Sequence, residues 1–254
     1  MSNKNTFETR DVVAFYDQIS DLQTAENVIL SIIRDSLPRM RMLDLGVGGG
    51  RTTHHFSRLA REYVGVDYSS AMVDICRTKF AGSIPEPSFF VCDATSMEMF
   101  SDGRFDFVLF SFNGLDYMGH DDRIKALREI SRVCAPNGLF CFSTHNIYAI
   151  EELYKIKTTN ALKAAYGFLI RNPLLMLMNE RFGTLKCRDY AIIRDSTHWY
   201  RLRTYYVKPS EQLRQLDAVG FKDTQVYSCI GTRLEPAVFE TNRDYSLYYL
   251  CRRA

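Results

Sequence analysis

The chain has 254 residues, of which 46% are hydrophobic, 24% charged and 13% aromatic, and its formal net charge is +2. This balance is typical of a globular protein, so a disordered, collagenous or low-complexity chain is excluded. A chain of this length buries enough apolar surface to fold without a metal or disulfide, either as one large α/β domain or as a core with an insertion.

Two N-terminal helices and five apolar runs predict the first half of the fold. Segments 7–20 and 23–37 predict the helices, and Pro38 ends the second. We expect these helices to form a lid, residues 1–40. The apolar runs that predict strands are 42–46, 63–67, 88–93, 105–112 and 139–144, with helices expected between them.

The predicted strands are nearly continuously apolar, which is typical of a parallel sheet covered on both faces. Repeated strand–helix alternation predicts right-handed βαβ units and a doubly wound, Rossmann-like α/β sheet. The alternation of strands and helices stops after the fifth strand. It resumes with a helix and two further strands, 223–230 and 245–251. We therefore expect a core of residues 41–146 and 209–254 and an α+β insertion, residues 147–208.

The insertion differs from the core in charge and aromatic content. Residues 147–209 contain eleven Lys or Arg against five Asp or Glu, together with seven of the fifteen Tyr and the only Trp. Two interpretations stay open: a solvated basic surface, or a segment that meets an acidic or aromatic partner. The pattern predicts a helix over 151–180, interrupted at Gly167 and at residues 171–173, and a hairpin with arms 184–193 and 198–207. The apolar stretches are too short for a membrane span.

The turn after the first strand carries the strongest single motif, MLDLGVGGGR at residues 42–51. Glycines between a buried strand and a helix let a ligand approach the backbone closely. A dinucleotide-binding G-x-G-x-x-G would need a third glycine where Arg51 stands, so that pattern fails. The spacing present is D-x-G-x-G-x-G, formed by Asp44, Gly46, Gly48 and Gly50.

This motif and several later segments, in the same order, resemble the class I S-adenosylmethionine-dependent methyltransferases. Asp67, at the end of the second strand, matches the acidic residue that takes the ribose hydroxyls, and a carboxylate can accept from both. Cys92-Asp93-Ala94 resembles the segment in which an Asp accepts from the adenine amino group. The segments 106–109 and 127–142 also match.

The resemblance implies S-adenosyl-L-methionine as cofactor, S-adenosyl-L-homocysteine as product, and a sheet of seven strands whose last strand is antiparallel. It also assigns Tyr16 to a lid over the methionine part of the cofactor, with packing in the core as the alternative. We expect the cofactor site to be formed by Tyr16, Asp44, Gly46, Gly48, Gly50, Asp67, Tyr68, Met72, Asp93, Ala94, Ser111 and Asn113.

The reacting groups should lie beyond the carboxyl ends of the fourth and fifth strands. His145 is the candidate catalytic base because imidazole titrates near neutrality; a structural histidine is the alternative. Asp116 is a further candidate contact. No metal is expected, because no His, Asp or Glu cluster has metal-ligand spacing. Arginine pairs with carboxylate or phosphate and tyrosine supplies a flat wall, so the candidate substrate residues are Tyr117, His145, Tyr200, Arg201 and Arg203.

The sequence therefore predicts an enzyme that methylates nitrogen or oxygen of a small-molecule acceptor by in-line transfer. One alternative is a methyltransferase of RNA or protein that docks through the basic insertion, although nucleic acid is not the expected partner. The others are a non-catalytic S-adenosylmethionine-binding protein and a dinucleotide oxidoreductase. The seven cysteines form no CxxC pair and the N-terminus has no signal-peptide core, so we expect a cytoplasmic location.

Overall fold

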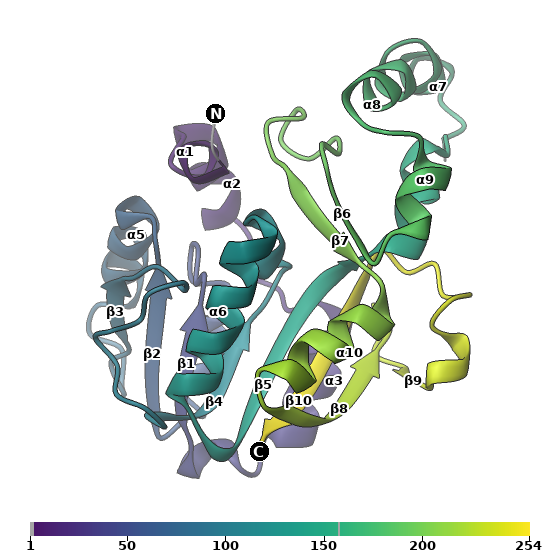
Figure 1. Cartoon of the computed structure of the whole chain (residues 1–254). Coiled ribbons are helices and arrows are strands. Elements are labelled where there is room, and N and C mark those ends of the chain that lie inside the picture. The colour runs from purple at the N-terminus through teal and green to yellow at the C-terminus, as the bar shows by residue number, and fades with distance from the viewer. Residues whose placement is uncertain (1–2, 157) are drawn as a thin grey trace.

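The computed structural model describes residues 3–156 and 158–254, and its centre is one mixed sheet (Figure 1). Seven strands form the body of this sheet in the order β3-β2-β1-β4-β5-β10-β8. The pairs from β3 to β5 are parallel, whereas β10 runs antiparallel to β5 and β8. The strands are β1 (Arg41–Leu45), β2 (Glu62–Asp67), β3 (Ser88–Val91), β4 (Phe105–Phe110), β5 (Cys134–Asn146), β8 (Phe221–Tyr227) and β10 (Ser246–Arg253).

The predicted doubly wound α/β fold with an antiparallel last strand is confirmed, and the strand count is corrected from seven to ten. Strand β9 (Arg233–Leu234) pairs with β8 at one edge. In the insertion, β6 (Tyr190–Ile193) and β7 (Thr204–Val207) form the predicted hairpin with shorter arms. Because β5 continues to Asn146, its end offers an edge with which β7 pairs in parallel.

Helices cover both faces of the sheet, and each face has its own apolar core. In Figure 1, α6 (His120–Val133) and α10 (Pro209–Ala218) lie in front of the sheet, and α3 (Thr24–Ile33) lies behind it. Neighbouring residues of β1 divide between the two cores, since Leu43 packs with α6 and Met42 packs with α3. The strand period of two therefore distributes the apolar run over both faces.

Further helices and turns complete the core. The expected helix 7–20 is two helices, α1 (Asn3–Phe7) and α2 (Arg10–Asp17), because the chain leaves helical geometry at Thr9, where ψ is 142°. The helix expected between the first and second strands is reduced to a single turn, α4 (Thr53–Phe56). Helix α5 (Ser70–Phe80) packs against β2 and β3, and 3-10 turns lie at Leu37–Arg39, Gly114–Tyr117 and Pro236–Val238.

The insertion projects away from the sheet (Figure 1). A 3-10 helix, Ile147–Tyr154, leads into α7 (Ala161–Tyr166), a π-helical turn (Gly167–Arg171), α8 (Asn172–Met178) and α9 (Phe182–Cys187). The expected interruptions at Gly167 and Arg171 are thus the two ends of a π-turn that joins α7 to α8. None of the described helices has the length and apolarity needed to cross a bilayer.

Candidate functional site

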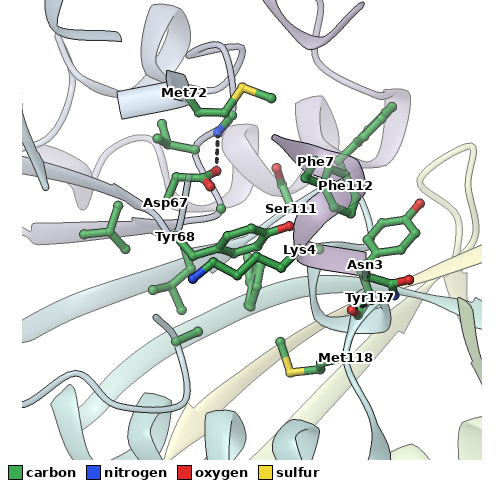
Figure 2. A pocket seen from close by; sticks show the side chains of 18 of the residues that line it. Asn3, Lys4, Phe7, Asp67, Tyr68, Met72, Ser111, Phe112, Tyr117 and Met118 are labelled. Carbon is green, nitrogen blue, oxygen red and sulfur yellow. Dashed lines mark hydrogen bonds between the residues drawn. The ribbon is translucent and has the colours of Figure 1, made fainter. Parts of the chain in front are cut away.

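A cavity of about 550 Å³ opens beyond the carboxyl ends of β1, β2 and β4 (Figure 2). We call it the first cavity. It is lined by most of the residues that the sequence places around a cofactor: Tyr16, Gly46, Gly48, Asp67, Tyr68, Met72, Asp93, Ala94 and Ser111. These residues come from separate loops, and the parallel strands bring the loops to one edge of the sheet.

Asp67 is the charged group at the centre of this cavity. Its carboxylate accepts the backbone N–H of Gly48 at 3.0 Å and that of Ser69 at 2.9 Å, and Figure 2 shows it between Tyr68 and Met72. Burial raises the pKa of Asp67, while the two N–H groups oppose that rise. The two bonds hold the carboxylate in place, and lone pairs remain for hydroxyl donors of a ligand.

The glycine loop combines open space with close packing. Gly48 has φ +54°, and the one atom within 4 Å of a methyl group added there is the carbonyl oxygen of Gly46, at 4.0 Å. At Gly49 an added methyl group would lie 2.7 Å from the backbone of Tyr16 and Asp17. Gly48 therefore leaves room on the cavity side, and Gly49 lets the end of α2 rest on the loop.

Two residues of the glycine motif that were expected at the cofactor, Asp44 and Gly50, do not line this cavity. The carboxylate of Asp44 is fully buried and accepts the hydroxyls of Thr52 and Tyr63, and its burial raises the pKa of Asp44 to about 6. At Gly50, an added methyl group would lie 2.5 Å from the ring of Phe80. Both residues therefore pack behind the loop, away from the cavity.

Arg51, the residue that breaks the dinucleotide pattern, is a buried support of the site. Its guanidinium pairs with both carboxylate oxygens of Glu26, at 2.5 and 2.8 Å, and donates to the hydroxyl of Ser111 at 2.9 Å. It also lies over the ring of Phe112 at 4.9 Å. No sequence spacing indicates this pair, because Glu26 lies on α3, far from the loop in the chain.

A second cavity of about 870 Å³ adjoins the first, and both are lined by Tyr16, Phe112 and Tyr117. The expected substrate residues His145, Tyr200 and Arg201 line it. Asn113, which was expected at the cofactor, lines the second cavity, and Arg203, which was expected at the substrate, lines the first. The wall also contains the aromatic side chains of Phe15, Tyr166, His198, Trp199, Tyr245 and Tyr248, beside polar residues such as Asp11, Gln23 and Arg171.

His145 is buried in the wall of the second cavity and is held by a carboxylate. Nδ1 lies 2.6 Å from Oδ2 of Asp116, which also accepts the backbone N–H of His145 at 2.7 Å. An ionised carboxylate only accepts, so Nδ1 carries the proton and Nε2 presents a lone pair. Nε2 lies 3.2 Å from Nδ2 of Asn113, whose buried Oδ1 has no hydrogen-bond partner among the described residues.

Asp116 lines neither cavity but stands behind His145. It is fully buried, and its Oδ1 accepts from the guanidinium of Arg123 and the hydroxyl of Thr144, each at 2.6 Å. The Arg123 guanidinium, also fully buried, donates to Gln212 and lies over the ring of Tyr205. The buried charges are therefore paired, as low-dielectric surroundings require.

Non-glycine residues with left-handed backbone gather around the second cavity. Phe112 and Asn113, directly after β4, have φ of 53° and 59°. In the insertion, His198, Trp199 and Tyr200 have φ of 46°, 59° and 61°. Each such residue costs about 1–3 kcal/mol, and such strain is concentrated at functional sites. All five line the second cavity.

The N-terminal helices and the insertion meet beside the two cavities. Asn3 donates to the carbonyl of Tyr117 at 2.8 Å and to that of Arg203 at 2.7 Å. Arg201 forms an ion pair with Asp11 of α2. Sequence reasoning missed Asn3, because it lies outside the predicted helix 7–20 and belongs to no motif; only its tertiary contacts reveal it. In residues 3–156 and 158–254, no cluster of His, Cys, Asp or Glu could hold a metal ion.

The doubly wound sheet, the glycine loop and the acidic residue after β2 together define the class I methyltransferase fold. A family described as "Methyltransferase domain" matches residues 42–138. The ubiquinone/menaquinone biosynthesis C-methyltransferase UbiE of Vibrio cholerae is 31% identical over 200 residues, which cover 76% of this chain and 68% of that protein. The chain belongs to the S-adenosylmethionine-dependent methyltransferases.

Solved structures of this class share the fold. An S-adenosylmethionine-dependent methyltransferase from Mesorhizobium loti superposes with a TM-score of 0.63 at 16% identity, over 90% of this chain and 98% of that one. A 1,6-didemethyltoxoflavin-N1-methyltransferase from Burkholderia thailandensis superposes with a TM-score of 0.54 at 16% identity, over 91% and 78%. Three other curated relatives match this chain over only 47 to 63% of their own length.

S-adenosylmethionine is the cofactor of this family, and the first cavity suits it. The cofactor has a ribose diol that donates two hydroxyls, and Asp67 offers a fixed acceptor. Gly48 leaves open space where any side chain would project.

Proposed function

We propose that this protein is an enzyme that transfers a methyl group to nitrogen or oxygen of a small-molecule acceptor held in the second cavity. The observation that carries the proposal is the pair of adjoining cavities. They share Tyr16, Phe112 and Tyr117, with Asp67 in one and His145 in the other. When bound, S-adenosylmethionine supplies a methyl group on a positively charged sulfur, which is open to attack by a nucleophile.

In this proposal the first cavity holds the cofactor through a few polar groups. Asp67 would accept the ribose hydroxyls. Asp93 would accept the adenine amino group; its Oδ1 is already bonded to Thr95, which leaves Oδ2 for the ligand. Tyr16, on α2, would cover the methionine part, because Gly49 brings the end of that helix onto the loop.

His145 would act as the base that removes a proton from the acceptor. Asp116 fixes the proton on Nδ1, so the lone pair lies on Nε2, where it accepts from Nδ2 of Asn113 at 3.2 Å. An acceptor N–H or O–H would take the place of that amide at Nε2. Asp116 would then be a positioning residue, since it touches neither cavity. The unpartnered Oδ1 of Asn113 would accept a second donor of the same acceptor. The aromatic wall would exclude water around the reacting atoms.

We also propose the division of labour along the chain: a lid of residues 1–40, a core of residues 41–146 and 209–254, and an acceptor-covering insertion of residues 147–208. The contacts of Asn3 with Arg203 and of Asp11 with Arg201 support it, because they join lid and insertion beside the cavities.

Two relatives support a small-molecule acceptor. The Burkholderia thailandensis enzyme was crystallised with bound 1,6-didemethyltoxoflavin and S-adenosylhomocysteine. The Vibrio cholerae relative is named for quinone biosynthesis. In this chain, the aromatic side chains that line the second cavity suit a flat small-molecule acceptor.

Calorimetry and a labelled-methyl assay test the proposal. S-adenosylmethionine should bind and NAD should not. If only NAD bound, the protein would not be an S-adenosylmethionine-dependent methyltransferase. Turnover of labelled cofactor with metabolite fractions should be insensitive to salt. A steep loss of binding or activity with added salt would indicate RNA instead, and labelling of protein would indicate a protein acceptor. A protein that binds the cofactor but labels no fraction would be a non-catalytic binder.

Substitution of His145 tests its role. His145→Ala should lower turnover by about 10²–10⁴-fold, the usual contribution of a general base, with cofactor affinity unchanged. The matched control is His55→Ala, because His55 bonds the carbonyl of Ser20 and lines neither cavity. Full activity in His145→Ala would assign the residue to structure alone.

A further inference from the structure

The helical tip of the insertion, residues 160–181, exposes an unusual amount of apolar surface. It contains α7, the π-turn and α8, which project from the rest of the molecule (Figure 1). The most exposed side chains are Leu162 at 84%, Leu177 at 82%, Phe168 at 70%, Leu169 at 69% and Met176 at 64%.

This apolar surface is not the outer side of a core. Only Gly167 and Leu175 are buried in α7, the π-turn and α8. A soluble helix normally buries one apolar stripe and exposes its polar face, whereas this tip exposes the apolar residues themselves. Contiguous exposed apolar surface of this kind marks a site of interaction with a partner or a lipid.

The segment that carries the apolar surface is also rich in positive charge. Residues 155–188 contain seven Lys or Arg and one Glu, so this segment alone accounts for the basic excess of the insertion. Lys155, Lys186 and Arg188 form ion pairs. Lys163, Arg171 and Arg181 have no carboxylate within ion-pair distance in the described part of the chain. Their charge is thus available to an anionic partner.

We propose that the tip docks on an anionic lipid bilayer. Leucine, phenylalanine and methionine side chains would enter the boundary between headgroups and acyl chains, while the unpaired cations would meet lipid phosphates. A second copy of this chain fits the same surface less well, because each tip contains three Lys or Arg against one Glu, and two tips of like charge would repel each other. The tip would lie on the surface of the bilayer and would not cross it, since none of the described helices is suited to span a bilayer.

Docking would bring the second cavity to the lipid surface. Tyr166 and Arg171, both in the tip, line that cavity, so an acceptor dissolved in the bilayer would have a short path to it. This consequence rests on the proposed function, whereas docking itself does not require it.

Vesicle sedimentation of the full chain tests the docking. We expect tighter binding to phosphatidylcholine vesicles that contain phosphatidylglycerol than to phosphatidylcholine alone, by about fivefold for each engaged cation. Leu169→Ser and Leu177→Ser should each weaken this binding at least about tenfold, the effect of losing one buried leucine. Lys163→Glu should weaken it by about tenfold or more and reduce its dependence on salt.

Matched controls lie elsewhere on the surface. Ile230→Ser removes an apolar side chain that is 68% exposed outside the tip, and Lys222→Glu reverses a charge on an exposed residue of β8. Both should bind vesicles like the unaltered protein. Melting temperatures should be unchanged in all the variants, because the altered side chains are exposed.

Three results would overturn the proposal. The first is that the unaltered protein does not distinguish the two vesicles, and the second is that the leucine variants bind like Ile230→Ser. The third is concentration-dependent self-association without vesicles that the leucine variants abolish, which would assign the tip to a second copy. Calorimetry with S-adenosylmethionine in the absence of vesicles tests the proposed function separately, so either proposal can fail without the other.

Discussion

Gly48→Ala and Gly50→Ala place the same methyl group at two left-handed positions of one loop, and the structure predicts opposite consequences. Gly48 lines the first cavity with φ +54° and has no atom within ordinary contact distance of an added methyl group except one carbonyl oxygen, at 4.0 Å. Gly50 has φ +83°, and its added methyl group would lie 2.5 Å from the ring of Phe80. Gly48→Ala should therefore weaken ligand binding, whereas Gly50→Ala should lower the stability of the fold.

The magnitudes follow from strain and crowding. Left-handed geometry costs an alanine about 1–2 kcal/mol, and both variants incur this cost. Gly50→Ala adds overpacking of about 1–3 kcal/mol, since Phe80 is buried in the core and cannot easily move. In a chain of this size each kcal/mol lowers the melting temperature by about 2–4 °C. Gly50→Ala should therefore melt about 4–20 °C lower and Gly48→Ala about 2–8 °C lower.

Gly82→Ala is the control for strain alone. Gly82 has φ +72°, and an added methyl group there would meet nothing within 4 Å. The melting temperatures of the three variants distinguish the cost of backbone strain from the cost of crowding against Phe80. Calorimetry with S-adenosylmethionine then shows which variants lose cofactor affinity. We expect Gly48→Ala to weaken cofactor binding at least about fivefold, because overpacking a close contact costs about 1–3 kcal/mol. Gly82→Ala should bind as the unaltered protein does.

Each outcome tests one part of the reasoning. Equal melting temperatures for Gly50→Ala and Gly82→Ala would show that Phe80 does not crowd the loop. Unchanged cofactor affinity in Gly48→Ala would show that the loop does not approach the ligand there. Loss of affinity in Gly50→Ala without loss of stability would reverse the assignments of the two glycines.

Three further predictions concern buried carboxylates. Asp67→Asn should weaken S-adenosylmethionine binding by about 10–100-fold, because a charged acceptor contributes about 1.5–3 kcal/mol; calorimetry checks it, with exposed Asp74→Asn as control. Asp116→Asn should lower the free energy of unfolding by about 3–5 kcal/mol in urea titrations, because it leaves Arg123 buried without its carboxylate; a smaller loss would mean that water reaches the pair. Burial raises the pKa of Asp44 from 3.8 to about 6, so the folded state keeps this proton that the unfolded chain releases. Stability should thus fall as pH rises from about 4 to about 6, by about 3 kcal/mol at 1.36 kcal/mol per pKa unit. In Asp44→Asn this fall should vanish; an unchanged pH profile would assign it to other groups.

Local patterns in the sequence predict those parts of the site that depend on neighbouring residues. The glycine loop, Asp67 and the pair Asp93 and Ala94 each follow an apolar strand, and the edge rule for parallel sheets brings them together. Strand order alone is therefore enough to predict that Gly46, Gly48, Asp67, Asp93 and Ala94 line one cavity.

Contacts between distant segments escape the same reasoning. Asp44 and Gly50 belong to the glycine motif, yet they pack behind the loop, because the direction of a side chain depends on the backbone angles of the turn. The support of Ser111 by Arg51 depends on Glu26 from α3. Such pairs form only when helices dock on the sheet.

The sequence by itself therefore determined the alternation of strands and helices, the glycine loop, Asp67 and the basic character of the insertion, since these depend on residue type and short spacing. Only the tertiary structure decided that Asp116 orients His145 and that the two cavities adjoin. It also decided that the insertion exposes its apolar residues rather than burying them. The physical reason is that hydrogen bonds, burial and exposure depend on which surfaces meet in three dimensions, and residue spacing along the chain does not specify those meetings.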